Sequence, residues 1–155
     1  MSEQSTKYSL EKSLGHLATR FSRVVLRRLN TGLAEIGLAI TAEQYSLLVQ
    51  LWEHNGLSQG TLADKTAKDK TTMARLAAGL ESRGLIERRS SASDGRERLL
   101  FLSDEGKSVM DQATALARKI LADAQKDISD EQLELCRSIL RRACANLQDA
   151  GGRRG

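Results

Sequence analysis

The sequence predicts a mainly α-helical fold with a small β-hairpin wing, that is, a winged helix-turn-helix flanked by N- and C-terminal dimerisation helices. Three observations lead to this expectation. Two helical segments and two short strands follow one another within residues 58–102, longer segments outside them repeat apolar residues every three or four positions, and proline is absent. We expect a single domain over residues 1–155, with a DNA-binding core at residues 41–102 between dimerisation helices at residues 9–36 and 103–149.

The central segment contains two helices and a hairpin. Residues 58–66 fit a short helix, and residues 69–83 fit a second one capped by Asp69, whose carboxylate can accept from the backbone N–H of Thr71 or Thr72. Gly84 stands where the chain leaves this helix and needs a positive φ. Residues 85–89 and 98–102 fit two strands around a tip in which Asp94 and Gly95 supply the bend.

The helices around this core have their own start and stop signals. A first helix is expected over residues 9–35 and closes at Gly37, and Ser103 caps the helix that follows the hairpin. Capping boxes are expected at Thr41 with Gln44 and at Ser129 with Gln132. The helix that starts at Thr41 is predicted to end at Gly56 and to turn these residues inward: Tyr45, Leu48, Leu51 and Trp52.

The apolar stripes of the three long helices exceed what the small core can cover. The stripe of the last helix contains Leu133, Cys136, Ile139, Leu140, Ala143 and Leu147. Leaving such stripes in water is unfavourable by roughly 25 cal/mol per Å². A homodimer that intertwines the N- and C-terminal helices is the simplest arrangement, and the alternative is a monomer in which these helices pack on each other.

The predicted helix at residues 69–83 has two contrasting faces. Met73, Leu76, Ala77 and Leu80 share one face and are expected to pack inward. The opposite face holds Thr71, Arg75 and Ala78, with Lys70 and Thr72 on its flanks. Short hydroxyls and one guanidinium suit the major groove, where Arg75 can reach guanine O6 and N7 or a phosphate, and Lys70 fits a phosphate contact. The alternative is an ordinary solvated face, although no acid lies between Lys70 and Leu80.

The hairpin and the preceding helix supply further candidate contacts. Arg96 at the tip is placed to enter the minor groove, and Asp94 is expected to hold a neighbouring arginine. Ser58 and Gln59 begin the first short helix, whose N-terminus can hold a phosphate. The strand arginines are candidate phosphate contacts, or else partners of Asp94 and Glu97: Arg88, Arg89 and Arg98.

The charge distribution agrees with a polyanionic partner. Residues 65–98 carry nine basic and five acidic groups, whereas the other residues balance at 15 of each, so the net charge of +4 lies in this segment. No apolar run approaches the roughly 18 residues of a membrane span, and we expect a cytoplasmic protein. Cys136 and Cys144 lie eight positions apart, too far for a mutual disulfide, and are interpreted as buried small residues, with an intermolecular or redox role as the alternative.

These segments together resemble the MarR (multiple antibiotic resistance regulator) family of bacterial transcriptional regulators. The resemblance rests on residues 57–63, 68–76, 80–89, 94–96 and 102–106, and the helix layout extends it to nearly the whole chain. It implies a homodimer with base or backbone contact by Thr71, Thr72 and Arg75, wing contact by Arg96 with Asp94 as its organiser, and an effector cleft between the dimerisation helices and the winged helix. The chain departs from the family pattern at Ala74 and in the tip at residues 90–93.

Three classes of function compete at this stage. The first is a regulator, expected to be a repressor, that binds a pseudo-palindromic double-stranded DNA operator and is released by a small aromatic or amphipathic effector, or has no effector. The second is a winged-helix module that docks a protein. The third, an enzyme, lacks a plausible site, because His16 and His54 are the only imidazoles and no nucleophile motif, metal cluster or cofactor motif appears. An effector pocket would draw on Phe21, Tyr45 and Trp52, which are otherwise interpreted as core residues.

Overall fold

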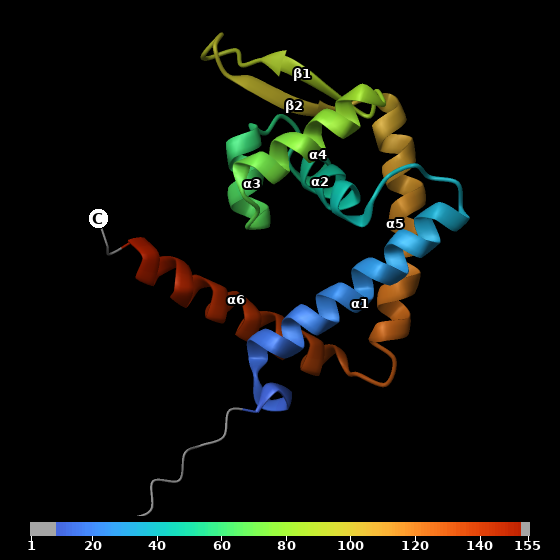
Figure 1. Ribbon diagram of the computed structural model, residues 1–155, viewed down its shortest axis with the longest axis vertical. Coiled ribbons are helices and arrows are strands. Elements are labelled where there is room, and N and C mark those ends of the chain that lie inside the picture. Colours follow the sequence, from blue (N-terminus) through green and yellow to red (C-terminus); the bar gives the residue numbers. More distant parts are fainter. Residues whose placement is uncertain (1–8, 153–155) are drawn as a thin grey trace, which may run out of the picture. The chain divides into compact units, whose positions relative to one another are not determined.

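The computed structural model describes residues 9–152 (Figure 1). The chain divides into two compact units, one that extends to Ile120 and one that begins at Leu121. The elements of the first unit are a 3₁₀ turn η1 (Leu10–Lys12), α1 (Leu14–Glu35), α2 (Ala42–Glu53), α3 (Gln59–Thr66), α4 (Lys70–Ser82), β1 (Ile86–Ser90) and β2 (Arg98–Leu102). Helix α5 (Asp104–Ala124) continues from it, and α6 (Asp130–Gly152) lies in the second unit. The predicted fold class, mainly α with a hairpin wing, is confirmed.

The first helix begins later than predicted. Ser13 has an extended backbone, and its hydroxyl accepts the N–H of His16 at 3.3 Å, so α1 starts at Leu14 and the residues before it form a separate turn. The end was predicted correctly: Gly37 has φ +76°, and the N–H of Leu38 returns to the carbonyl of Leu33 at 2.9 Å. The apolar spacing continues on both sides of Ser13, but the capping bond that this serine accepts sets the residue at which α1 begins.

The predicted caps form as expected. Thr41 Oγ1 accepts the N–H of Gln44 at 3.1 Å, and Gln44 Oε1 accepts the N–H of Thr41 at 3.1 Å. Ser129 and Gln132 exchange the corresponding bonds at 3.2 and 3.0 Å before α6. Each box satisfies N–H groups that the first helical turn leaves without partners, which is why both helices start where the sequence indicates.

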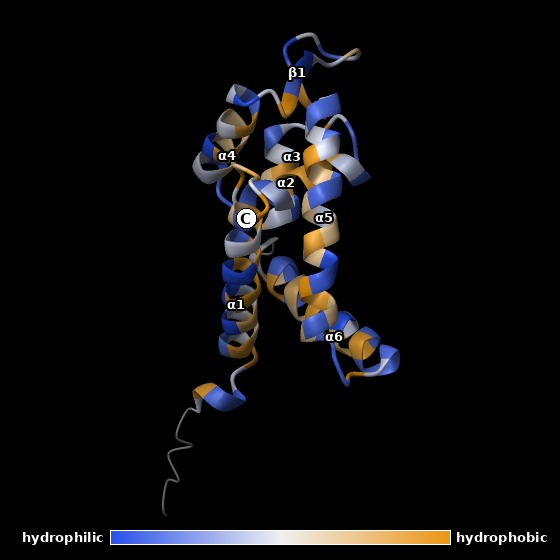
Figure 2. Ribbon diagram, turned by 90° about the vertical axis from the view of Figure 1, so that its right-hand side faces the viewer, coloured by the Kyte–Doolittle hydropathy of each residue, from blue (hydrophilic) through white to orange (hydrophobic). Residues whose placement is uncertain are grey.

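The core of the first unit is built almost entirely of aliphatic side chains from α1, α2, α3, α4, the hairpin and α5. Its largest fully buried members are Leu33, Leu47, Leu48, Leu51, Leu62, Met73, Leu80, Ile86 and Leu100. Figure 2 shows polar and hydrophobic positions alternating along α5, as expected of a helix that packs on one side only. Trp52 is a correction: it was predicted to point inward with Leu48 and Leu51, yet it is 54% exposed, because the buried face of α2 is shifted toward Leu47.

The hairpin is joined to the segment before α3. Strands β1 and β2 pair antiparallel with Ile86 opposite Leu102, and Leu57 forms an isolated bridge with Leu100. The predicted end of α2 at Gly56 is wrong, since α2 ends at Glu53. Gly56 has φ +84° and lies so close to Phe101 that a Cβ would come within 2.9 Å of its ring. Its role is therefore to let the chain pass under the hairpin.

The second unit contains the last helix, which leaves much of its apolar surface uncovered in the single chain. Leu135, Ile139, Leu140 and Leu147 are all exposed. Cys136 and Cys144, interpreted above as buried, are both exposed free thiols. The helical periodicity was predicted correctly, but a stripe becomes a core only where another element covers it. No helix among the residues that the structure describes is long and apolar enough to cross a membrane.

Candidate nucleic-acid interface

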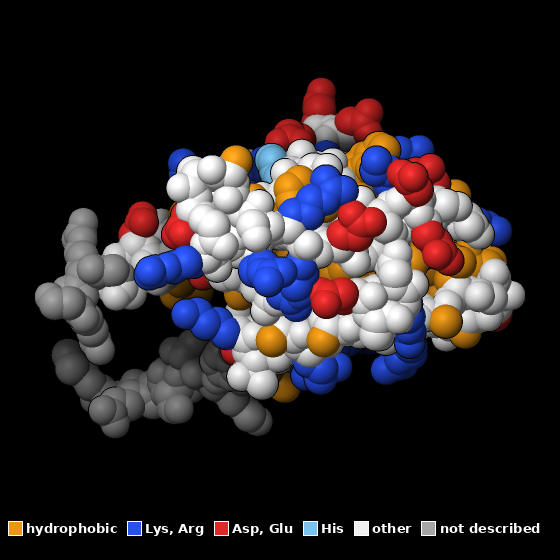
Figure 3. Space-filling view, turned by 90° about the horizontal axis from the view of Figure 1, so that it is seen from above, with side chains coloured by type: hydrophobic (Ala, Val, Ile, Leu, Met, Phe, Trp, Pro, Cys, Tyr) orange, Lys and Arg blue, Asp and Glu red, His pale blue; other side chains and the backbone are white. Residues whose placement is uncertain are grey.

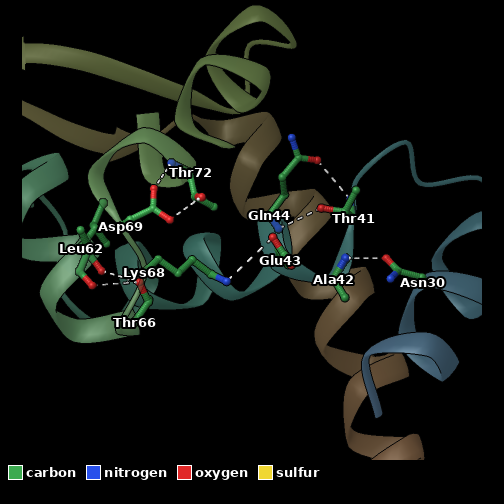
Figure 4. Close-up of polar contacts among 11 residues, drawn as sticks. Asn30, Thr41, Ala42, Glu43, Gln44, Leu62, Thr66, Lys68, Asp69 and Thr72 are labelled. Carbon is green, nitrogen blue, oxygen red and sulfur yellow. Dashed lines mark hydrogen bonds and ion pairs between the residues drawn. The ribbon is translucent and has the colours of Figure 1, made fainter. Parts of the chain in front are cut away.

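The N-terminus of α4 is fixed by Asp69. One carboxylate oxygen accepts the backbone N–H of Thr72 at 2.7 Å and the other accepts the Thr72 hydroxyl at 2.9 Å (Figure 4). The hydrogen bond from the Thr72 backbone, followed by that from its hydroxyl, holds the pKa of Asp69 below its ordinary value. Asp69 is thus an ionised N-cap, as predicted, and it orients Thr72 as well.

The two faces of α4 lie as the sequence predicts. Met73, Leu76, Ala77 and Leu80 are buried, whereas Lys70, Thr71, Arg75 and Ala78 are exposed and Thr72 is half-buried. Gly79 lets α4 approach α2 closely, because a Cβ there would lie 2.7 Å from Nε2 of the buried Gln44. Packing on one side therefore presents a basic, hydroxyl-bearing surface on the other.

The segment that leads into α4 is attached to α2. Lys68 pairs with Glu43 across 3.8 Å, and the N–H of Ala42 is accepted by Oδ1 of Asn30 at 2.8 Å, which attaches α2 to α1 in turn (Figure 4). The Lys68 ammonium is thereby directed toward the protein. The orientation of α4 is set by these contacts together with its apolar face.

At the start of α3, Ser58 and Gln59 are both engaged. Ser58 Oγ accepts the N–H of Thr61 at 3.1 Å and its hydroxyl hydrogen-bonds Thr61 Oγ1 at 3.0 Å, so Ser58 is an N-cap. Gln59 Oε1 accepts from the Arg88 guanidinium. What α3 offers to a phosphate is therefore its N-terminal backbone more than these two side chains.

Arg88 ties the wing to both helices. Its Nε donates to Glu81 of α4 and its Nη1 donates to Gln59 of α3. Of the alternatives that the sequence left open for this residue, a pairing with Asp94 or Glu97 is therefore wrong. This half-buried residue holds β1 against the helix-turn-helix, a role for which the sequence carried no signal because its partners lie 7 and 29 positions away.

The tip of the wing is organised by backbone bonds. Oδ1 of Asp94 accepts the backbone N–H of Arg96 at 3.0 Å, and the N–H of Ser91 donates to the carbonyl of Glu97 at 2.8 Å. Asp94 was expected to hold a neighbouring arginine, and it does so through the backbone N–H of Arg96 in the turn. Arg96 and Arg98 are both exposed.

Arg89 differs from its neighbours on the hairpin. It pairs with Glu87 at 2.9 Å and its guanidinium lies 4.7 Å from the centre of the Phe101 ring.

Seen from the hairpin end, basic side chains are interspersed with acidic ones, so this face has several separate positive positions and no unbroken basic patch (Figure 3).

The three predicted effector-pocket residues do not come together. Tyr45 and Trp52 line a pocket of 410 Å³ between α2 and α5, where the Tyr45 hydroxyl hydrogen-bonds Thr114 Oγ1 at 3.1 Å. Its other lining residues are Val49, Glu53, Met110, Asp111, Thr114 and Arg118. Phe21 is not among them; it is 56% exposed on α1. Polar and charged side chains of α5 complete this pocket, and no sequence pattern distinguishes them from other exposed positions of that helix.

Comparison with known proteins identifies the family. A model of the MarR family matches residues 40–97, which contain α2, α3, α4, β1 and the tip of the hairpin. A probable transcriptional regulator from Pseudomonas aeruginosa is 30% identical, with 87% of this chain and 99% of that chain covered and a TM-score of 0.73. The chain belongs to the MarR family.

Other MarR-type relatives agree with this assignment. The chain is similar to the transcriptional regulator HosA of Escherichia coli, at 30% identity over 52% of this chain and 60% of HosA. It is also similar to CouR from Rhodococcus jostii RHA1, solved with p-coumaroyl-CoA, at 29% identity, 87% and 94% coverage and a TM-score of 0.77. The match spans about three fifths of the length of HosA.

Proposed function

We propose that this MarR-family regulator binds double-stranded DNA as a homodimer and represses transcription from a pseudo-palindromic operator, with half-sites about one helical turn apart. The observation that carries the proposal is the outer face of α4, where Lys70, Thr71 and Arg75 are exposed and no acidic residue intervenes. Met73, Leu76 and Leu80 fix the opposite face in the core. This arrangement presents donors in a rigid orientation, as base reading in the major groove requires.

The residues of α4 take different parts in this proposal. Arg75 is assigned to base edges and Thr71 to a phosphate or base edge, because their side chains are exposed on the outer face. Thr72 already donates its hydroxyl proton to Asp69, so it is left with its methyl group and its acceptor lone pairs for contact with DNA. Lys70, beside the N-terminus of the helix, is assigned to a phosphate.

The wing supplies the flanking contacts. Arg96 is assigned to the minor groove, because the turn that Asp94 closes holds its backbone while its side chain remains exposed. Arg98 is assigned to a phosphate. Arg88 acts through its bonds to Gln59 and Glu81, which set the angle between the wing and the helices.

The homodimer is supported by uncovered apolar side chains at both ends of the chain. On η1 and α1 these are Leu10, Leu14, Leu17, Phe21 and Val24, and on α6 they are Leu135, Ile139, Leu140 and Leu147. Rows of this length on two helices are unusual for a monomer. A partner subunit that covers them also supplies the second reading head that a pseudo-palindrome requires.

A small-molecule effector fits the pocket between α2 and α5. Tyr45 and Trp52 offer aromatic surface and Arg118 offers a cation, a combination suited to an amphipathic aromatic acid. CouR, a relative of similar fold, was solved with p-coumaroyl-CoA. An effector that binds more tightly to a dimer with wrongly spaced reading heads would release DNA by linkage.

The test is fluorescence anisotropy on DNA from upstream of the protein's own gene. Arg75→Ala and Arg96→Ala are each expected to weaken binding by about 1–3 kcal/mol, or roughly 5- to 150-fold in Kd. Arg83→Ala serves as the matched control, because Arg83 is an exposed arginine at the other end of α4. Unchanged affinity in both test variants would refute the site. A purified dimer that ignores duplex DNA at low salt would favour the protein-docking alternative.

A further inference from the structure

One stripe of α6 is palindromic: its leucines and cysteines follow in the same order whether the helix is followed forward or backward. Leu133, Cys136, Leu140, Cys144 and Leu147 follow one another at spacings of 3, 4, 4 and 3 positions, so the pattern is symmetric about Leu140. At about 100° per residue these five side chains lie within an arc of roughly 80°. They therefore form one continuous stripe along the helix.

Much of this stripe is uncovered within the chain. Leu147 is 77% exposed, Leu140 is 37% exposed, and both thiols are exposed. The edge next to the stripe is internally paired, since Glu134 binds both Arg137 and Arg141 at 3.3 Å. A surface of this kind, apolar in the middle with paired charges at its side, is suited to a second helix.

We propose that two copies of α6 pair antiparallel about a twofold axis at Leu140, so that Cys136 faces Cys144 of the partner subunit and the two thiols form an oxidisable pair. The proposal rests on the homodimer proposed above. In such an arrangement a residue that lies a given number of positions before Leu140 faces the residue that lies the same number of positions after Leu140 in the partner subunit. Leu133 then faces Leu147 of the partner subunit, and Leu140 faces its own copy, which is why the symmetry of the stripe favours a second copy as its occupant.

The geometry of helix packing permits a bond at these positions. Helix axes pack about 8–10 Å apart and each Cα lies about 2.3 Å from its axis, so Cα atoms that face each other come to roughly 5 Å. Disulfides need Cα atoms about 4.4–6.8 Å apart. Within one helix the two cysteines are separated by about 12 Å along the axis, so neither can pair inside its own subunit.

The reaction is a thiol–disulfide exchange with a low-molecular-weight disulfide such as oxidised glutathione. The Cys136 thiolate attacks this oxidant, forms a mixed disulfide and releases one glutathione thiol. Cys144 of the partner subunit then attacks the Cys136 sulfur and displaces the second glutathione. The two protein thiols lose two electrons and their protons, and the oxidant is reduced to two thiols. Because the axis is twofold, the dimer gains two such links and its subunits can no longer separate.

The experiment uses the full chain, treated with oxidised glutathione and separated on a non-reducing denaturing gel. The wild type is expected to shift to the mass of a dimer and to return on reduction. Cys136→Ser alone and Cys144→Ser alone are each expected to run at the mass of one chain, because the remaining thiol of each subunit then faces a serine. Co-expression of the two variants is expected to restore the dimer band in the mixed dimers, each of which retains one complete pair.

Light scattering of the same reduced samples separates the inference from the proposed function. A dimer mass without cross-linking in the wild type, or cross-linking in either single variant, overturns the pairing and leaves the homodimer intact; α6 would then be covered by another element such as α1 of the partner subunit. A monomer mass overturns both. A peptide that joins Cys136 to Cys144, found by mass spectrometry in the mixed sample, would confirm the register.

Discussion

Asp69 caps the N-terminus of α4, and its charge makes the stability of the protein depend on pH. Because its pKa is lowered in the folded state, its charge stabilises the fold above the ordinary carboxyl pKa, and this stabilisation is lost as the pH falls through the lower folded value. We expect the wild type to unfold at higher urea than Asp69→Asn at pH 6, and the difference to shrink progressively as the pH falls below the ordinary carboxyl pKa of about 4. Asparagine is the matched change, since it can still cap the helix but carries no charge.

The measurement is urea unfolding of both proteins at several pH values and one fixed protein concentration, because the unfolding of a dimer depends on concentration. Thr72→Val removes the hydroxyl bond to the same carboxylate and should reduce the pH dependence in part, since the backbone bond remains. A gap between wild type and Asp69→Asn that stays constant from pH 6 to pH 3 would show that the charge is not what stabilises the start of α4.

At the scale of elements, the junction between the hairpin and α5 brings two stretches of backbone close together. A Cβ on Gly106 would come within 2.0 Å of the Leu85 carbonyl oxygen, which also accepts the N–H of Ser103 at 3.1 Å. Ser103 Oγ accepts the Gly106 N–H at 3.0 Å and its hydroxyl donates to the Gly84 carbonyl at 2.5 Å. The first turn of α5 thus lies directly on the backbone that enters β1.

Gly106→Ala should therefore destabilise the protein by about 1–3 kcal/mol, because backbone must move to admit the methyl group. Gly60→Ala is the control: a Cβ there meets nothing closer than Ser58 Oγ at 3.9 Å, and the helical position should gain up to about 1 kcal/mol. Both are measured by chemical denaturation. Equal stability of the two variants would mean that the junction can relax without cost.

At the scale of the whole molecule, two copies of each contact make the DNA affinity depend steeply on salt. Each neutralised phosphate contributes about 0.9 to the slope of log affinity against log salt. Lys70→Ala should lower that slope by about 1.8, since a homodimer loses two contacts, and should weaken binding similarly on all sequences. Anisotropy titrations over a range of salt concentrations test this, with Arg83→Ala as the control. A change of only about 0.9 would indicate one bound subunit per duplex.

The dimer itself is measured without DNA. Light scattering is expected to give 34 kDa, twice the 17.0 kDa of the chain, at micromolar concentration. Leu140→Glu would place two carboxylates together at the axis proposed for α6 and should weaken association in that arrangement. Full-strength association in this variant would argue that Leu140 does not lie at the twofold axis.

Much of the reading helix was predictable from residues close together in the sequence. The Asp69 cap, the buried face through Leu76 and Leu80 and the positive φ of Gly84 all depend on neighbours within a few positions, and the structure bears each of them out. Predictions that depended on distant partners fared less well. Trp52 and Cys136 are exposed, and Arg88 bonds Gln59 and Glu81.

By itself, the sequence determined the type and order of the elements, their caps and the family, because capping and helical periodicity are short-range effects. Only the tertiary structure decided that Gly56 passes beneath Phe101, that Leu57 bridges to Leu100 and that Gly106 lies on Leu85. Those contacts join segments that are separate in the chain. Such contacts form only where the shapes of two distant segments fit together at close packing, and the sequence of either segment alone does not reveal that fit.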